Sequence, residues 1–108
     1  MQSLKLRNGK SVGHVKDGVA VIPVKPRNYY GAYGGYSIDA EVLTQIQRAG
    51  CHTIEFHYKS SKAEKQFRID FNTFLAHRRA TPDYGYGTKY VVHESHYTLV
   101  GPQVPSTT

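Results

Sequence analysis

The sequence predicts a single small α+β domain, and three observations support this fold class. Its 108 residues are enough for one domain, and a hydrophobic fraction of 39 % is enough for one modest core. Segments with the alternation of β-strands are grouped near the N-terminus and in the second half of the chain, and one clear amphipathic helix separates them. Because strands and helices do not alternate regularly, we expect an N-terminal β-meander, one main helix, and an antiparallel sheet with a second short helix.

Two turn dipeptides divide the N-terminal segment into three strands. Asn8-Gly9 and Asp17-Gly18 both tolerate the positive φ angles of a type I′ turn, which is the common connection in tight hairpins. Proline at positions 23 and 26 ends the third strand. The expected strands cover residues 3–7, 10–16 and 19–24. The alternative is one hairpin with an irregular segment, because Gly13 interrupts the middle strand.

Residues 37–49 have the spacing of an amphipathic helix. Either Ser37 or Asp39 can cap its first turn, and Gly50 suits the position after its last turn. Its apolar residues fall on one stripe at helical spacing; they are Ile38, Val42, Leu43, Ile46 and Ala49.

An antiparallel hairpin with one solvated face is predicted next, over residues 52–59 and 66–71. Apolar side chains alternate with polar ones in both segments, and the polar stretch between them indicates a flexible loop. The period then changes, which predicts a short helix over residues 72–79, capped near Asn72 and ended before Pro82.

The last part of the domain is expected to contain strands over residues 89–93 and 96–100. They form either one bent strand or a hairpin that turns at Glu94-Ser95. The domain therefore covers residues 1–100, and residues 101–108 are expected to form a flexible tail.

Positive charge is concentrated at the start of the chain. The net charge is +6, and residues 1–36 carry six Lys and Arg against the single carboxylate of Asp17. A concentrated positive charge favours an anionic partner such as nucleic acid. The longest uncharged apolar run, residues 19–24, is too short to cross a membrane, and the first residues lack the apolar core of a signal peptide. We therefore expect a cytoplasmic protein that does not contact membranes.

Most of the nine tyrosines lie in two glycine-containing segments, NYYGAYGGY at residues 28–36 and DYGYGTKY at residues 83–90. Tyrosine rings can stack on bases, and neighbouring Lys and Arg can contact phosphates. The alternative is that the first segment only covers a small core. The candidate ligand-binding residues are Lys25, Arg27, Tyr29, Tyr30, Tyr33, Tyr36, Arg68, Arg78, Arg79, Tyr84, Tyr86 and Lys89.

Other candidate sites have simpler explanations. His93 and His96 would point to opposite faces of a strand, so we expect no metal site. On the solvated face of the hairpin, Glu55 opposite Arg68 or Asp70 opposite His57 could be ordinary cross-strand pairs. The only cysteine, Cys51, excludes an internal disulfide and is expected to be buried. We therefore predict no cofactor and no catalytic residue.

These observations predict a small, basic, non-enzymatic protein that binds nucleic acid. One alternative is a pocket for a small phosphorylated ligand related to a nucleotide, formed where copies of a homo-oligomer meet. Another is a protein-interaction module, such as an inhibitor or accessory factor of a mobile element, with tyrosines as interface anchors.

Overall fold

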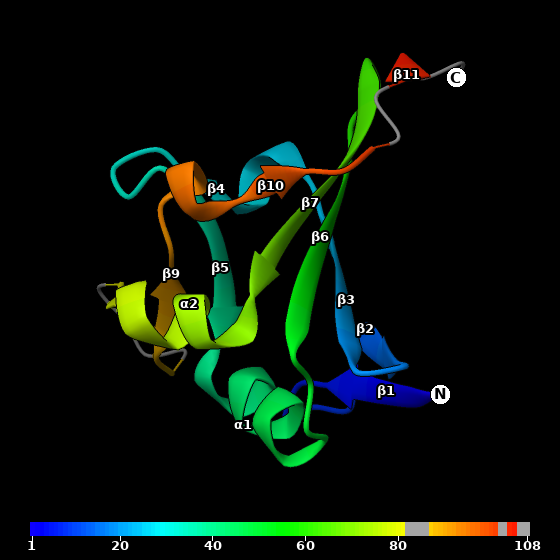
Figure 1. Cartoon of the computed structure of the whole chain (residues 1–108), viewed down its shortest axis with the longest axis vertical. Coiled ribbons are helices and arrows are strands. Elements are labelled where there is room, and N and C mark those ends of the chain that lie inside the picture. Colours follow the sequence, from blue (N-terminus) through cyan, green and yellow to red (C-terminus); the bar gives the residue numbers. More distant parts are fainter. Residues whose placement is uncertain (82–86, 102–103, 106–108) are drawn as a thin grey trace.

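The computed structural model describes residues 1–81, 87–101 and 104–105, which fold into two sheets and two helices (Figure 1). This arrangement confirms the predicted α+β class. The first sheet contains, in spatial order, β1 (Gln2–Lys5), β2 (Ser11–Lys16), β3 (Val19–Val24), β6 (Thr53–Lys59), β7 (Ala63–Asp70) and β10 (Thr98–Leu99). The second contains β4 (Tyr29–Tyr30), β5 (Gly35–Asp39), β9 (Lys89–Val91) and β8 (Arg79–Ala80). The helices are α1 (Ala40–Arg48) and α2 (Phe71–His77), and the short 3-10 turns are η1 (Pro26–Asn28) and η2 (Glu94–His96).

The N-terminal meander forms as predicted from β1, β2 and β3. Its second turn has the expected positive φ angles, 52° at Asp17 and 77° at Gly18. In the first turn only Gly9 has a positive φ, so the predicted type I′ geometry is wrong at Asn8. Gly13 does not break β2, because its missing side chain lets the strand approach the backbone of Val21 more closely than a Cβ atom would allow.

The first sheet is mostly antiparallel, as predicted, but at its centre β3 and β6 pair in parallel. Residues 25–52 leave the first sheet after β3 and return to begin β6 in the same direction. This excursion contains β4, β5 and α1, and parallel neighbours require a long connection of this kind.

The main helix is shorter than predicted. Residues 37–39 belong to β5 and pair with β9, so Ser37 does not cap the helix. Asp39 occupies the N-cap position, but its side chain accepts no capping hydrogen bond. Val42, Leu43 and Ile46 are buried, as their spacing predicts.

The hairpin of β6 and β7 and the following helix are confirmed with shifted boundaries. Strand β7 begins at Ala63, so half of the segment predicted as a flexible loop, residues 63–65, is strand. Glu55 lies opposite Arg68 as predicted, whereas Asp70 lies opposite Thr53 and not His57. Asp70 also caps α2 by accepting hydrogen bonds from the backbone N–H groups of Asn72 and Thr73, which places the cap before the predicted Asn72.

Residues 89–100 form neither a bent strand nor a hairpin. Strand β9 joins the second sheet, η2 turns the chain, and β10 joins the first sheet beside β7. This segment therefore connects the two sheets. Val104 and Pro105, which fall in the predicted tail, pair with Glu64 and Ala63 of β7.

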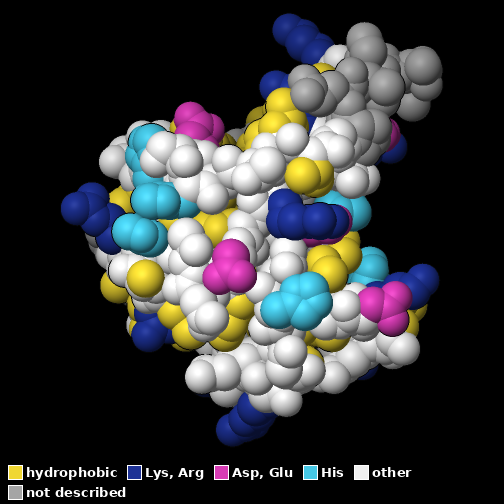
Figure 2. Space-filling view, viewed as in Figure 1, with side chains coloured by type: hydrophobic (Ala, Val, Ile, Leu, Met, Phe, Trp, Pro, Cys, Tyr) yellow, Lys and Arg dark blue, Asp and Glu magenta, His cyan; other side chains and the backbone are white. Residues whose placement is uncertain are grey.

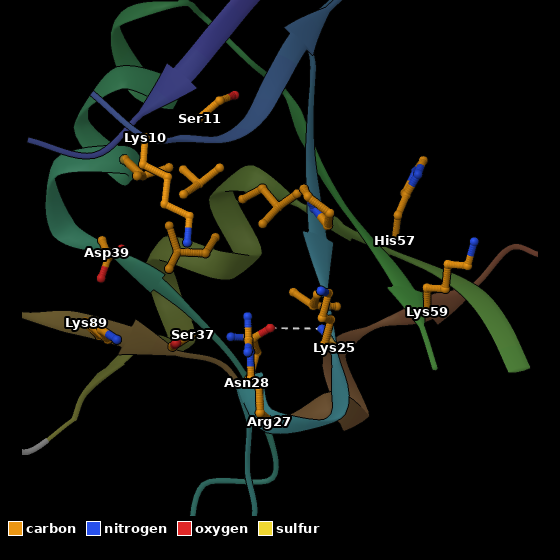
Figure 3. Close-up of a pocket in the computed structure, with 16 residues that line it drawn as sticks. Lys10, Ser11, Lys25, Arg27, Asn28, Ser37, Asp39, His57, Lys59 and Lys89 are labelled. Atoms are coloured by element: carbon orange, nitrogen blue, oxygen red, sulfur yellow. Dashed lines mark hydrogen bonds between the residues drawn. The ribbon is translucent and has the colours of Figure 1, made fainter. Parts of the chain in front are cut away.

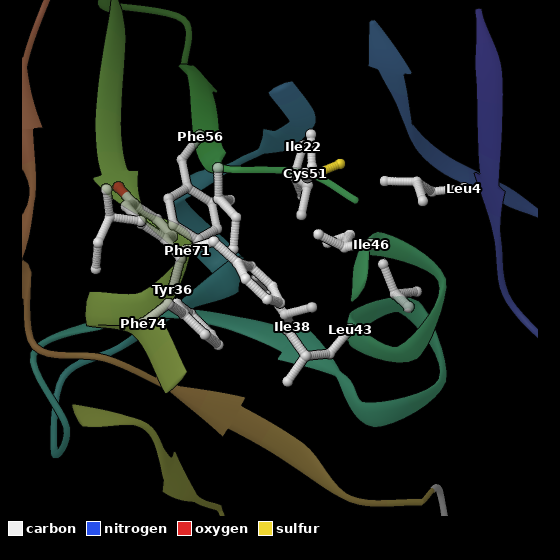
Figure 4. Close-up of a cluster of buried hydrophobic side chains, with 14 of the residues drawn as sticks. Leu4, Ile22, Tyr36, Ile38, Leu43, Ile46, Cys51, Phe56, Phe71 and Phe74 are labelled. Carbon is white, nitrogen blue, oxygen red and sulfur yellow. The ribbon is translucent and has the colours of Figure 1, made fainter. Parts of the chain in front are cut away.

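The core lies between the sheets and the two helices (Figure 4). Phe56 from β6 and Phe74 from α2 are fully buried at its centre, and Ile46 contributes from α1. Cys51 is 6 % exposed at the edge of this core, as predicted, and burial raises the pKa of its thiol.

Candidate functional site

A cavity of about 420 Å³ opens between the end of β3, the turn η1 and strand β5 (Figure 3). We call it the basic pocket. Five cationic side chains line it, namely Lys10, Lys25, Arg27, Lys59 and Lys89. Three of these residues, Lys25, Arg27 and Lys89, belong to the predicted site. The structure therefore brings residues from distant parts of the chain to one cavity.

The inner wall of the basic pocket is apolar. Ile22 and Val24 contribute from β3, Ile38 from β5 and Val42 from α1. These side chains are between 2 % and 7 % exposed, so they belong to the core and are held in place by it. The pocket therefore combines a rigid apolar floor with a charged rim.

Local sequence fixes the position of the two cations next to β3. Pro26 begins η1, where its fixed φ angle favours the turn and its missing N–H is not needed. Asn28 closes the turn because its Oδ1 accepts a hydrogen bond of 2.9 Å from the N–H of Lys25. Lys25 and Arg27 consequently face the same cavity from either side of the proline.

Carboxylates neutralise little of this positive charge. Lys59 pairs with Glu64 at 3.3 Å, so it contributes least. Within the described part of the chain, no ion pair joins a carboxylate to Lys10, Lys25, Arg27 or Lys89. The Lys10 side chain extends from the β1–β2 turn into the basic pocket, with Asp39 on one side and Lys25 on the other (Figure 3).

Asp39 is the one carboxylate among the described lining residues. Burial raises the pKa of Asp39, and the nearby charge of Lys89 partly offsets this rise. Asp39 therefore offsets part of the positive charge of the basic pocket.

The tyrosines predicted to form the site do not line the basic pocket. Tyr29 and Tyr36 pack edge to face, with ring centroids 5.4 Å apart, beside a shallow cavity on the far side of Pro26. Tyr29 is 38 % exposed and can meet a ligand, whereas Tyr36 is only 7 % exposed. Tyr36 stacks among Phe56, Phe67 and Tyr97 in the core, and burial raises its pKa to about 12.

Tyr36 therefore belongs chiefly to the core, which contradicts its prediction as a residue of the ligand rim, although its edge lines the cavity of Tyr29. Residues 29–36 form the β4–β5 hairpin instead of an irregular loop, and alternation along β5 turns Tyr36 inward. Tyr30 is half-buried in β4, and Tyr33 lines a separate cavity together with histidines.

The predicted arginines are dispersed. Arg68 donates to Glu55 from its Nε at 3.0 Å on the outer face of the first sheet. Arg78 lies 4.8 Å from the centre of the Tyr90 ring, a cation–π geometry. Arg79 lines the same cavity as Tyr33. Tyr84 and Tyr86 lie outside the described residues.

Sequence reasoning missed Lys10 and Lys59, because each joins the pocket from a turn or strand end whose spatial neighbours are far away in sequence. It also misplaced His93 and His96: His93 caps the 3-10 turn η2 and His96 is its last residue, so they do not lie on the two faces of a strand. Over residues 1–81, 87–101 and 104–105, no three His, Cys, Asp or Glu side chains converge as metal ligands.

Comparison with protein-family models, curated proteins and solved structures finds no match to this chain. Its class is therefore defined by fold and site alone: a small α+β protein with an apolar-floored, cationic pocket. Among the described residues, no helix has the length and apolar character needed to span a bilayer.

Proposed function

We propose that this protein binds nucleic acid, with one nucleotide in the basic pocket. The observation that carries the proposal is the placement of Lys10, Lys25, Arg27 and Lys89 around a floor of buried aliphatic side chains. Cations at the rim attract phosphate, and an apolar wall accepts the face of a base. A cavity of about 420 Å³ is also within the usual range for a bound small molecule, roughly 300–1,000 Å³.

The surface next to the basic pocket favours a nucleic-acid strand over a single nucleotide as the ligand. Turn η1 separates the basic pocket from the aromatic cavity of Tyr29, and Pro26 lines that second cavity while Arg27 lines the first. A strand that crosses η1 would place one nucleotide in the pocket and a neighbouring base against Tyr29. The exposed Lys65 beside Tyr29 supplies a further phosphate contact.

The second candidate is a small phosphorylated ligand held wholly within the basic pocket, and the limited size of the cavity favours it. The two candidates differ in their dependence on salt. A strand that contacts several phosphates loses affinity steeply as salt rises, whereas a single nucleotide loses it shallowly.

The direct test reverses two charges of the pocket. We expect Lys25→Glu/Arg27→Glu to weaken binding of a mixed-sequence 20-nucleotide DNA or RNA by at least about tenfold at low salt, measured by fluorescence anisotropy. The matched control is Lys16→Glu/Lys62→Glu, because both lysines are exposed, lie outside the basic pocket and give the same change in net charge.

Two results would contradict the proposal. One is the absence of binding by the unmodified protein to DNA and to RNA at low salt. The other is an equal loss of affinity in both double variants, which would mean that net charge alone, and not the pocket, attracts the ligand.

A further inference from the structure

Three histidines meet at a second cavity, on a different part of the surface from the basic pocket. Histidine side chains gather over α2, η2 and the β4–β5 turn (Figure 2). The cavity has a volume of about 340 Å³ and is lined by Gly31, Ala32, Tyr33, Gly34, His77, Arg79, His93 and His96. We call it the histidine pocket.

The β4–β5 turn is fastened directly to the segment that carries two of these histidines. The N–H of Glu94 donates to the carbonyl of Gly34 at 2.7 Å. The His93 ring lies so close to Gly34 that an added Cβ would stand 2.5 Å from its Cδ2 atom. Gly34 has a φ of +70°, so a glycine is required there for both backbone shape and ring contact.

Hydrogen bonding fixes which nitrogen of His93 can donate to a ligand. The Nδ1 atom of His93 accepts from the N–H of Ser95 at 3.0 Å, and this bond caps η2. Because Nδ1 accepts, the proton of the neutral ring is on Nε2. The Nε2–H group is therefore a donor that the turn does not use.

The other two imidazoles stack face to face. The rings of His77 and His96 have centroids 4.0 Å apart and an angle of 19° between their planes. The in-plane lone pairs of nearly parallel rings do not converge on one point, which disfavours a shared metal ion. Two protonated rings at this distance repel each other, so an anion nearby favours the doubly charged state.

The charged groups around the stacked rings are suited to an anion. Arg79 contributes a guanidinium from β8, while Tyr33 and the Nε2–H of His93 can donate hydrogen bonds. Within the described part of the chain, no carboxylate lines the cavity. Glu94 is the nearest acid along the chain, and its side chain lines the cavity of Tyr29 instead.

We propose that the histidine pocket binds a phosphate monoester group. The guanidinium of Arg79 and the imidazoles of His77, His93 and His96 hold the phosphate oxygens, and Tyr33 closes the pocket. A volume of about 340 Å³ is roughly ten times that of a water molecule in the liquid, so the ester substituent can remain attached. This site goes beyond the proposed function and does not depend on it, because a free phosphate ester fits as well as the phosphorylated end of a strand.

The proposal is tested by titrating the full-length protein with inorganic phosphate and following the histidine ring signals by NMR. Phosphate should shift the signals of His77, His93 and His96, and Arg79→Gln should weaken this binding at least fivefold. Arg78→Gln is the matched control, because Arg78 precedes Arg79 but stacks on Tyr90 and does not line the pocket. Unshifted ring signals, or equal weakening in both variants, would overturn the proposal.

Sulfate is a second probe of the site, because its charge, unlike that of inorganic phosphate, is constant near neutral pH. His77→Gln should weaken sulfate binding at least fivefold, and His14→Gln on β2, outside the pocket, should not. Sulfate binding that is unchanged in His77→Gln would contradict the role of the stacked pair.

The source of the phosphate is decided with two oligonucleotides of one sequence, one with a 5′-phosphate and one with a 5′-hydroxyl. Tighter binding of the phosphorylated strand, lost in Arg79→Gln, identifies a strand end as the ligand. Equal binding of both strands, with phosphate still shifting the ring signals, identifies a free phosphate ester. The test with inorganic phosphate is also repeated on Lys25→Glu/Arg27→Glu, where an unchanged response shows that this site does not need the basic pocket.

Discussion

Basic side chains line both the basic pocket and the histidine pocket, but the two pockets differ in the kind of base. Five lysine and arginine side chains line the basic pocket. The histidine pocket has one guanidinium, that of Arg79, and three imidazoles, which can donate hydrogen bonds through their ring N–H groups. The comparison shows that one small domain can present two basic cavities of different composition.

Strand β5 connects the two pockets physically. Its residues Ser37, Ile38 and Asp39 line the basic pocket, and the turn before it, with Gly31 and Gly34, lines the histidine pocket. Tyr36 and Gly35 lie between these ends and are both buried. Substitutions along β5 therefore test whether the pockets share one scaffold.

The largest effect is expected for Tyr36→Ala. Its ring packs 5.8 Å from Phe56 and 6.5 Å from Tyr97, centroid to centroid, so truncation removes the aromatic link between the sheets. Loss of a buried aromatic side chain typically costs about 3–5 kcal/mol of unfolding free energy. Binding of nucleic acid and of phosphate should both weaken as the fold is destabilised. Urea denaturation measures the stability, and the two binding assays measure the affinities.

Tyr33→Ala is the comparison for Tyr36→Ala, because Tyr33 is only half-buried at the edge of the histidine pocket. It should cost less than about 1 kcal/mol of stability and weaken only phosphate binding. Equal destabilisation by the two substitutions would show that the whole β4–β5 segment is core.

A smaller effect is expected for Gly35→Ala. An added Cβ at Gly35 would overlap the carbonyl oxygen of Val92 and lie 3.0 Å from the Tyr97 hydroxyl, which donates to that carbonyl at 2.8 Å. Forcing an atom into such a contact typically costs about 1–3 kcal/mol. Because Val92 precedes His93, phosphate binding should suffer more than nucleic-acid binding.

Gly31→Ala provides the control for this substitution. A Cβ at Gly31 meets nothing within 4 Å, and the backbone there does not have a positive φ. Its stability should change by less than about 0.5 kcal/mol in the same urea experiment. A loss as large as that of Gly35→Ala would mean that the turn tolerates no side chain at all.

The scaffold around these glycines was only partly predictable from the sequence. Elements with their own periodicity or turn signal were recovered, such as the β6–β7 alternation, the apolar stripe of α1 and the Asp17-Gly18 turn. Strands β4 and β8 have two residues each, which is too short for any period, and they are strands only because another segment pairs with them. Residues 37–39 of β5 were assigned to the helix that follows, so the second sheet was missed.

The same reason limited the prediction of the sites. Lys25 and Arg27 lie near each other in sequence and were assigned together, and the structure places both at one cavity. Lys10 reaches that cavity through the meander, and His77 reaches His96 only because α2 and η2 meet across the fold. No local pattern contains either contact. Tyr36 was misassigned because tyrosine suits a core and a binding surface equally well.

An effect of about 1 kcal/mol is expected for Glu55→Gln on β6, where the carboxylate pairs with His57 and Arg68. Burial raises the pKa of Glu55, but hydrogen bonds from His57 and Arg68 outweigh it, so the pKa is below the ordinary carboxyl value. Such a group stabilises the fold fully above the ordinary carboxyl pKa, and this stability is lost as pH falls through the lowered pKa.

Glu55→Gln should therefore lower unfolding free energy by about 1 kcal/mol at pH 7, and the difference should shrink as pH falls through the lowered pKa of Glu55. Glu64→Gln removes the more exposed pair with Lys59 and should cost less than about 0.5 kcal/mol at any pH. Urea denaturation at a series of pH values measures both, and an equal, pH-independent loss would show that Glu55 acts through packing and not through its charge.

The smallest effect is expected for Asp39→Asn, which removes the carboxylate that lines the basic pocket. Because burial raises the pKa of Asp39, its ionisation disfavours the folded state at neutral pH, and that penalty disappears as pH falls below the ordinary carboxyl pKa. The substitution should therefore make the protein slightly more stable at pH 7 and leave its stability unchanged in acid, as measured by urea denaturation. The Asp39 side chain accepts no capping hydrogen bond, so the substitution removes no contact of that kind from α1.

Loss of the negative charge of Asp39 should also tighten nucleic-acid binding by about threefold while phosphate binding at the histidine pocket stays the same. Weaker nucleic-acid binding by this variant would instead show that Asp39 contacts the ligand, as it would if the ligand offered a hydrogen-bond donor to the carboxylate.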